Sequence, residues 1–253
     1  MSELPHCPHA IVTGGGRGIG REIAAALTAA GATVTVLGRH RPALDAVVMA
    51  GAADFAVVAD VADQAQIDAA ITEVGTRQKI DILIANAGVA ESAPFAKSDA
   101  ALFRRMMDVN LMGVVHSVRA ALPFMYDRPY GRVVAVASTA GLKGYAYVSA
   151  YSAAKHAVIG LVRSLALELA TTRITVNAVC PGFTDTDLAT ASINNIMEET
   201  GRSHSQAVAE LARYNPQRRL VTTSEVANAV LWLCGEGASA ITGQAIAVAG
   251  GEI

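Results

Sequence analysis

The sequence lacks paired cysteines, long apolar runs and any strong excess of one charge. Its three cysteines, Cys7, Cys180 and Cys234, are odd in number and have no paired spacing, which indicates a reducing, cytoplasmic setting. The formal net charge of −2 predicts no nucleic-acid partner. No run approaches the roughly 18 apolar residues that a membrane span needs. Residues 1–9 also lack the apolar core and cleavage site of a signal peptide.

Charged residues are scarce as well. They make up 17% of the 253 residues, against 52% for hydrophobic residues, as in a compact chain with a large core. We find no linker, internal repeat or low-complexity segment. The sequence therefore predicts one domain spanning residues 1–253.

A metal centre is not predicted. His6, Cys7 and His9 are close in sequence, but no further cysteine and histidine set completes a site, so we interpret residues 6–9 as an N-terminal tail. Cys180 lies in an apolar stretch, which favours a buried, inert thiol over a nucleophile.

Strand and helix patterns alternate along the chain, which predicts a doubly wound, Rossmann-like parallel sheet of seven strands covered on both faces. The strand patterns are short, apolar and β-branched. We expect strands at 10–13, 33–37, 55–58, 80–85, 132–137, 175–179 and 244–248. We expect helices at 18–30, 42–50, 63–76, 99–126, 150–170, 188–199, 205–214 and 224–234.

One long excursion, from residue 181 to residue 224, contains no predicted strand. It follows the carboxyl end of a strand, where open α/β sheets bind ligands. We predict a helical substrate lid over about 183–215. The alternative is a surface insertion without a function.

A glycine-rich segment joins the first strand to the first helix. Residues 13–20 read Thr-Gly-Gly-Gly-Arg-Gly-Ile-Gly. Glycines allow a tight turn close to a pyrophosphate, and the free N–H groups at the start of the helix face that anion. The position between strand and helix makes this a dinucleotide site.

The end of the second strand carries no acid. An acid there would bind the 2′-hydroxyl of NAD and repel a 2′-phosphate, whereas Arg39 presents a planar cationic group that suits phosphate. Arg17, in the glycine-rich segment, could join it. The alternative is that both are solvated surface arginines; we predict NADP(H) as the cofactor.

Tyr151 and Lys155 are four residues apart on a predicted helix, so they share a face. A neighbouring cation lowers the pKa of a phenol and makes it a workable general acid and base. Ser138 directly follows a strand, where its hydroxyl can bond a substrate carbonyl oxygen or serve only as a turn residue. Asn110 is a poor residue for a helix interior and suggests a distorted turn with a functional purpose.

Together these features resemble the short-chain dehydrogenase/reductase family over essentially the whole chain. The motifs that carry the resemblance are Thr13 to Gly20, Asp60-Val61, Asn86-Ala-Gly88, Asn110, Ser138, Tyr151-x-x-x-Lys155 and Pro181-Gly182-x-x-x-Thr186. Ala85 stands where the family often has asparagine.

The resemblance implies a role for each motif. Tyr151 would transfer the proton, Ser138 would polarise the carbonyl oxygen, Lys155 would hold the nicotinamide ribose, and Asn110 would anchor a water relay. The residues implied to bind the cofactor are Gly14, Gly16, Arg17, Gly18, Ile19, Gly20, Arg39, Asp60, Val61, Asn86, Ala87, Gly88, Tyr151, Lys155, Pro181, Gly182, Phe183, Thr184 and Thr186. Members are usually homotetramers built on the long helices and the last strand.

Residues 174–183 resemble 3-oxoacyl-thioester reductases and polyketide ketoreductases, whereas the lid is similar in length to that of 3-hydroxybutyrate dehydrogenases. Where the latter hold a free carboxylate with polar and basic groups, this chain has Ala90, Ala140 and Val148. An uncharged thioester therefore fits better than a small free acid. Three arginines lie near the expected site entrance and are either carrier-docking residues or ordinary surface charge: Arg128, Arg132 and Arg173.

The main hypothesis is an oxidoreductase of 3-oxoacyl thioesters, carried by coenzyme A or a carrier protein. The second is a dehydrogenase of a cyclic or aromatic secondary alcohol or ketone. The third is an NADP-binding sensor without turnover, against which the complete Asn110, Ser138, Tyr151 and Lys155 set argues. The lid residues Ile193, Ile196, Met197, Val208 and Leu211 either form an apolar wall for the substrate or only join the lid helices together.

Overall fold

A computed structural model describes residues 4–5 and 7–253. Its centre is a parallel sheet of seven strands in the order β3-β2-β1-β4-β5-β6-β7. The strands are β1 (His9–Thr13), β2 (Thr33–Gly38), β3 (Phe55–Val58), β4 (Ile82–Ala85), β5 (Gly131–Val136), β6 (Ile174–Pro181) and β7 (Ala245–Val248). The predicted doubly wound sheet is thus confirmed.

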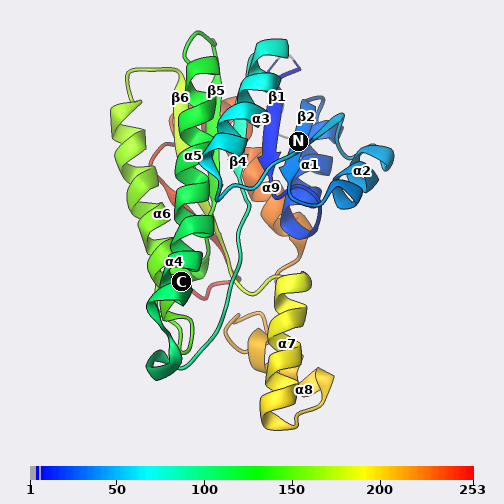
Figure 1. The fold of residues 1–253 in the computed structure, drawn as a ribbon, viewed down its shortest axis with the longest axis vertical. Coiled ribbons are helices and arrows are strands. Elements are labelled where there is room, and N and C mark those ends of the chain that lie inside the picture. Colours follow the sequence, from blue (N-terminus) through cyan, green and yellow to red (C-terminus); the bar gives the residue numbers. More distant parts are fainter. Residues whose placement is uncertain (1–3, 6) are drawn as a thin grey trace.

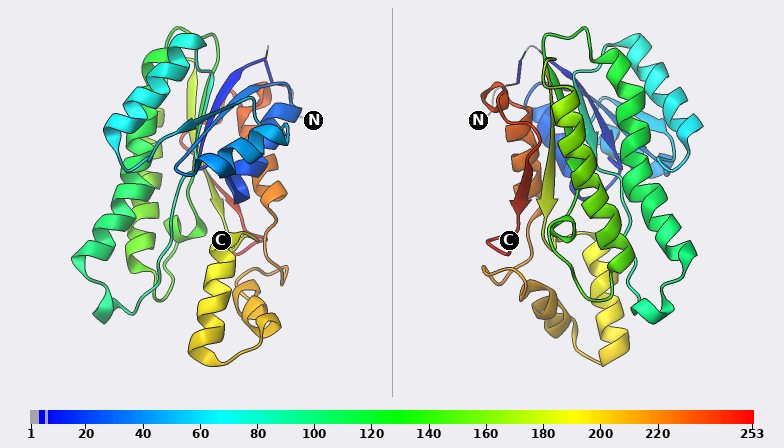
Figure 2. Two further views of the ribbon diagram at one scale, coloured as in Figure 1. Left: turned by 45° about the vertical axis from the view of Figure 1, so that its right-hand side comes forward. Right: turned by 90° about the vertical axis from the view of Figure 1, so that its left-hand side faces the viewer.

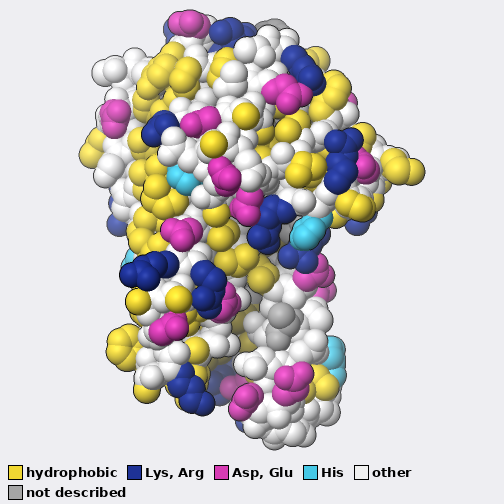
Figure 3. All heavy atoms as spheres, in the orientation of Figure 1, with side chains coloured by type: hydrophobic (Ala, Val, Ile, Leu, Met, Phe, Trp, Pro, Cys, Tyr) yellow, Lys and Arg dark blue, Asp and Glu magenta, His cyan; other side chains and the backbone are white. Residues whose placement is uncertain are grey.

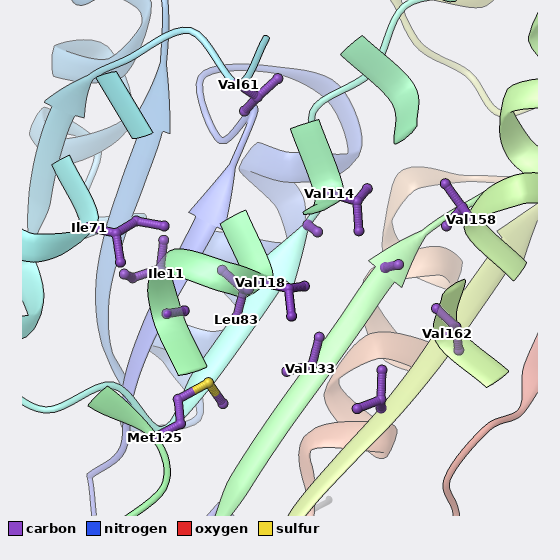
Figure 4. Close-up of a cluster of buried hydrophobic side chains, with 14 of the residues drawn as sticks. Ile11, Val61, Ile71, Leu83, Val114, Val118, Met125, Val133, Val158 and Val162 are labelled. Atoms are coloured by element: carbon purple, nitrogen blue, oxygen red, sulfur yellow. The ribbon is translucent and has the colours of Figure 1, made fainter. Parts of the chain in front are cut away.

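Helices cover both faces of the sheet (Figure 1). They are α1 (Gly18–Ala29), α2 (Arg41–Met49), α3 (Gln64–Arg77), α4 (Ala100–Met107), α5 (Gly113–Ala121), α6 (Ser149–Glu168), α7 (Asp187–Thr200), α8 (His204–Ala212) and α9 (Thr223–Cys234). One core joins the sheet to α3, α5 and α6, and Figure 4 shows Val118 of α5 beside Leu83 and Val133 of the strands. A second core joins the sheet to α1, α2 and α9.

Local residues mark the helix ends. Asp63 caps α3 by accepting a hydrogen bond from the Gln66 backbone N–H at 3.1 Å, as expected for an acid at that position. Gly31, directly after α1, has φ of +90°, which glycine adopts without the strain that a Cβ would cause. The termini and turn residues therefore agree with the alternating pattern.

The stretch predicted as one helix over 99–126 is interrupted. Between α4 and α5 lies a π-helical turn, Asp108–Met112, and a 3₁₀ turn, Leu122–Phe124, ends the stretch. A π turn inserts one extra residue into the helix and is costly unless something stabilises it. Asn110 lies at its centre, so the distorted turn suggested by the sequence is confirmed.

Helices α7 and α8 project beyond the carboxyl edge of the sheet, where the strands end (Figure 2). Ser203 begins α8 with a capping box that it forms with Gln206, and Gly201, between the two helices, has φ of +67°. A recess separates this lobe from the lobe that contains α4 (Figure 3). The chain ends at the same edge (Figure 2).

Gly20 tests how tightly the first turn of α1 is packed. A methyl group at this position would overlap the Gly14 carbonyl oxygen and the Asn86 side-chain amide. We expect Gly20→Ala to lower the free energy of unfolding by about 1–3 kcal/mol in urea denaturation, since overpacking forces the backbone to move. Gly237→Ala is the matched control, because no atom lies within 4 Å of the added carbon, and it should leave that free energy nearly unchanged. An equal effect of the two substitutions would contradict this packing.

Candidate active site

All the predicted site residues near strand ends lie at one edge of the sheet. β1, β4, β5 and β6 end at Thr13, Ala85, Val136 and Pro181, and parallel strands bring their carboxyl ends to the same side. The glycine-rich turn, residues 86–88, Ser138 and residues 182–186 follow these ends directly. The topology therefore brings together segments that are far apart in sequence.

The glycine-rich turn fits an anion. Gly14 and Gly18 have φ of +65° and +51°, and α1 begins without a side-chain cap on its first amides. Such amides point at a bound anion in line with the helix dipole. Asn86 holds the turn in place because its Nδ2 donates to the Thr13 and Gly14 carbonyl oxygens at 2.9 and 3.3 Å. The Asn86 side chain is thus used to connect two loops.

Two arginines lie near the predicted adenosine end, each paired with an acid. Arg39 Nη1 is 3.7 Å from Asp60 Oδ2. Arg17 Nη1 is 3.2 Å from Oδ2 of Asp187, the first residue of α7, and both of these side chains are about 70% exposed. Exposed pairs of this kind contribute about 0–1 kcal/mol, so either arginine can exchange its partner for a phosphate at little cost.

Asn110 connects the π turn to the loop after β4. Its Oδ1 accepts a hydrogen bond from the Val89 N–H at 3.1 Å, and its Nδ2 donates to the Val89 carbonyl at 3.0 Å. Nδ2 also donates to the Met106 carbonyl at 3.0 Å. A Cβ placed on Gly88 would lie 2.9 Å from Asn110 Oδ1 and 3.5 Å from Lys155 Nζ. The distorted turn therefore brings Asn110 close to Lys155.

Lys155 is buried on α6 and donates from Nζ to the Val136 carbonyl oxygen at 2.9 Å. Burial disfavours the charged ammonium and lowers the pKa of Lys155 to about 8. One turn earlier, Tyr151 is half-buried, with its ring centroid 5.7 Å from Lys155 Nζ. The predicted pair therefore shares one face of the helix.

The expected direction of the Tyr151 pKa shift is wrong. Burial raises the pKa of Tyr151, and a hydrogen bond from the Ser138 side chain opposes this only in part. The expectation considered only the nearby cation and not the loss of hydration. A phenol is protonated at neutral pH even at its ordinary pKa, so the Tyr151 hydroxyl holds a proton, although the raised pKa makes it a weaker acid.

Ser138 also has the turn role that the sequence left open. Its Oγ accepts a hydrogen bond from the Ala140 N–H at 3.1 Å and so caps the 3₁₀ turn Thr139–Gly141. A serine hydroxyl retains a donor while it accepts such a bond. Ser138 can therefore hold this turn and still polarise a carbonyl oxygen.

Sequence reasoning did not identify a group of side chains that packs beside the turn after Ser138. The rings of Tyr145, Phe183 and Tyr214 pack with centroids 5.5–5.9 Å apart. Near them, Glu252 Oε1 is 3.0 Å from Lys143 Nζ and accepts a hydrogen bond from the Tyr145 hydroxyl. Only Phe183 was predicted to lie at the site. Residues more than 30 positions apart carry no spacing signal, which explains why the others were missed.

The three arginines considered for carrier docking are at the wrong edge. Arg132 is the second residue of β5, Arg128 precedes that strand, and Arg173 precedes β6, so all three are at the amino ends of strands. Arg132 is buried and stacks on the Tyr130 ring at 4.2 Å, while Arg128 pairs with buried Asp81 at 2.5 Å. Arg128 and Arg132 are therefore not ordinary surface charges.

The apolar lid residues mainly join the lid helices to each other. Ile193 of α7 and Leu211 of α8 are buried in one cluster, against which Ile196, Met197 and Val208 pack. Phe183 also packs against this cluster. Of the predicted pocket residues, Ala140 is buried, Val148 is half-buried and Ala90 is exposed.

The sequence predicts neither a metal centre nor a membrane-spanning helix. No group of three or more metal-ligating side chains occurs in residues 4–5 and 7–253; His6 of the possible N-terminal cluster lies outside them. Within the same residues, no helix is both long enough and apolar enough to cross a membrane. Cys180 is buried, and burial raises the pKa of its thiol to about 11.

Comparisons with known proteins agree with this geometry. The family model described as short chain dehydrogenase matches residues 8–196. The (−)-trans-carveol dehydrogenase of Rhodococcus erythropolis is 37% identical, covering 96% of each chain. The 3-oxoacyl-acyl-carrier-protein reductase MabA of Mycobacterium avium is 34% identical, covering 95% of this chain and 88% of its own. A solved structure of a tryptophan variant of actinorhodin polyketide ketoreductase with NADPH superposes with a TM-score of 0.92 at 35% identity, covering 97% of each chain.

Proposed function

The chain belongs to the short-chain dehydrogenase family of oxidoreductases, and we propose that it is an NADP(H)-dependent enzyme that interconverts a 3-oxoacyl thioester and its 3-hydroxyacyl form. The thioester is carried by coenzyme A or by a carrier protein. The observation that carries the substrate proposal is a buried anion beside the site: the Glu252 side chain is 2% exposed and already pairs with Lys143.

The proton-transfer role falls to Tyr151. Its hydroxyl is protonated at neutral pH, so it can donate to the carbonyl oxygen during reduction. Ser138 orients that oxygen, and the Lys155 ammonium, fixed by the Val136 carbonyl, holds the nicotinamide ribose and stabilises the phenolate that forms. Asn110 anchors the loop beside Lys155 and the water relay. Bound NADP(H) supplies or accepts the hydride.

The cofactor would lie along the carboxyl edge. The uncapped amides of α1 would face the pyrophosphate, Arg39 would bind the 2′-phosphate, with Arg17 beside it, and Asp60-Val61 would contact the adenine. Backbone groups of residues 86–88 would face its ribose, and residues 181–186 would hold the nicotinamide. NADPH is bound in the structural relative, actinorhodin polyketide ketoreductase, which supports NADP(H) over NAD(H).

An uncharged substrate suits this site better than a free acid. A substrate carboxylate would need a cation, yet Lys143, near the aromatic rings, is paired with Glu252. The buried Glu252 charge would also repel a second anion at close range. A thioester carbonyl carries no charge and avoids both costs. The ketoacyl-reducing activity named for MabA supports the same substrate class.

A cyclic or aromatic ketone is the second candidate. The packed rings of Tyr145, Phe183 and Tyr214 could stack against a flat ring, and the carveol dehydrogenase relative acts on a cyclic alcohol by its name. A non-catalytic NADP sensor has no observation in its favour.

The proposal includes four further properties of the protein. We propose that α7 and α8 form the substrate lid over about 183–215 and that residues 1–253 act as one domain. We also propose a homotetramer, as the family resemblance implies, and a cytoplasmic location, which the three free cysteines Cys7, Cys180 and Cys234 support.

Tyr151→Phe should remove most turnover while leaving the fold and NADPH binding intact. Only the hydroxyl that carries the proton is lost, and such groups contribute about 10²–10⁴-fold to rate. Steady-state kinetics measure the loss, and fluorescence titration with NADPH measures binding. Retention of half the activity would refute the assignment.

Arg39→Ala should weaken NADPH about ten- to a hundredfold and NADH far less. A charge-assisted hydrogen bond to phosphate is lost only with NADPH. Arg41→Ala is the matched control, because Arg41 is engaged with Asp45 at 2.8 Å one turn along its own helix; dissociation constants for it should stay near wild type. Equal losses for both cofactors would show that Arg39 does not bind the 2′-phosphate.

Substrate class is tested by comparing kcat/KM for acetoacetyl-CoA, free acetoacetate and an aryl ketone under the same conditions. We expect the thioester to be the best substrate, because Lys143, the cation near the aromatic rings, is already paired with Glu252. If acetoacetate is best, the argument from Glu252 is wrong. If the aryl ketone alone is reduced, the second candidate replaces the first.

A further inference from the structure

Tyr147 combines two features that are unfavourable for a tyrosine. Its φ is +67°, in the left-handed region, where a bulky residue is an outlier because its Cβ crowds the backbone. Tyr147 is also 66% exposed, although most of its ring is apolar. Strained backbone of this kind persists only where the surrounding structure holds it, and it gathers at functional sites. Neither feature stabilises the fold, so the reason for a tyrosine at this position lies in what its ring can contact.

The backbone of Tyr147 is attached to the lobe that contains α4. Its carbonyl oxygen accepts a hydrogen bond from the Ala93 N–H at 2.7 Å. Ala93 packs against a small apolar cluster formed by α4 and the first turns of α6, and Tyr151 packs against the same cluster. The strained turn is therefore fixed to the cluster that also positions the residue proposed to transfer the proton.

Two residues earlier, the same loop contacts the lid. The Tyr145 ring packs edge-on against the rings of Phe183, at 5.9 Å, and Tyr214, at 5.5 Å. Residues 145–147 thus join the lid to the lobe that contains α4, and a recess separates these two lobes (Figure 3). The turn at Tyr147 therefore lies at this recess, where its exposed ring is accessible to a molecule that enters the site.

The chemistry of the ring limits what it can recognise. The two faces of an aromatic ring bind methylene groups or another ring, and the gain grows with the apolar area that becomes buried. The carbonyl oxygen of the substrate is assigned to Ser138 and Tyr151. The part of the substrate left for Tyr147 is therefore an apolar group that extends beyond the reacting ketone.

We propose that Tyr147 is a specificity-determining residue whose ring contacts the apolar part of the substrate beyond its reacting ketone. This rests on the ketone reduction proposed for the site. The apolar part has two possible sources, the acyl chain of a 3-oxoacyl thioester beyond its fourth carbon and a substituent on a cyclic ketone. Both offer the same apolar surface to the ring.

The test compares substrates that differ only in this apolar part. The N-acetylcysteamine thioesters of acetoacetate and 3-oxooctanoate share the reacting group, and the second has four further carbons. A fully buried methylene group contributes about fourfold to binding. With these carbons partly buried against the ring, the wild-type enzyme should prefer the longer thioester by about tenfold or more in kcat/KM.

Tyr147→Gly and Tyr147→Ala should both abolish that preference, because both remove the ring. We expect kcat/KM to fall about tenfold for the longer thioester, through KM, and to stay within about twofold for the shorter one. Glycine adopts a φ of +67° without strain and alanine does not, so Tyr147→Gly should have a higher Tm than Tyr147→Ala. Tyr126→Ala removes another exposed tyrosine and should change neither kcat/KM value.

Equal losses of kcat/KM on both thioesters, through kcat, would overturn the proposal, because a ring with a merely structural role would affect them alike. The absence of a chain-length preference in the wild-type enzyme would overturn it as well, as would a lower Tm for Tyr147→Gly than for Tyr147→Ala.

Cyclohexanone and 4-phenylcyclohexanone separate this proposal from the thioester proposal. If the thioesters are inert but the phenyl-bearing ketone is favoured through Tyr147, only the thioester proposal fails. If the wild-type enzyme and both Tyr147 variants reduce the thioesters equally well, only the Tyr147 proposal fails. If the wild-type enzyme reduces none of these ketones, both proposals fail.

Discussion

The hydrogen bond from the buried Lys155 ammonium to the Val136 carbonyl at the end of β5 is the contact on which the site depends. Burying a cation costs several kcal/mol unless polar groups compensate it, and this cost lowers the pKa of Lys155 to about 8. The bond fixes the start of α6 against the sheet edge. Tyr151 lies one turn before Lys155 and is fixed with it, and a Cβ placed on Gly141 would lie 2.7 Å from the Lys155 backbone oxygen, so the turn after Ser138 packs directly on α6.

The features that could be predicted from the sequence are those that depend on residues close together in the chain. Every strand was located to within a few residues because apolar, β-branched runs between turn residues have few alternative structures. Asn110 signalled its distorted turn because asparagine is unfavourable inside a regular helix. The family resemblance added roles that spacing alone does not give, and these roles remain proposals.

What the sequence could not predict depends on contacts between distant segments. Tyr145 and Glu252 are 107 residues apart, and a glutamate next to the chain end looks like ordinary surface charge. The placement of three arginines near the site entrance was wrong for a different reason. Arg132 is the second residue of its strand, which places it at the amino edge of any parallel sheet, and a loose likeness to other reductases outweighed that simple topological argument. The Tyr151 pKa shift was misjudged because burial is not visible in a sequence.

The central claim is that this edge of the sheet brings a ketone carbon to the nicotinamide and a proton from Tyr151. Mass spectrometry of the product formed from NADPH deuterated at the transferable C4 position tests it most directly. The account predicts one deuterium on the carbinol carbon of the alcohol, formed by the wild-type protein from a ketone of the proposed classes. An alcohol without deuterium at that carbon, or no alcohol from any of these ketones although NADPH binds, would contradict it.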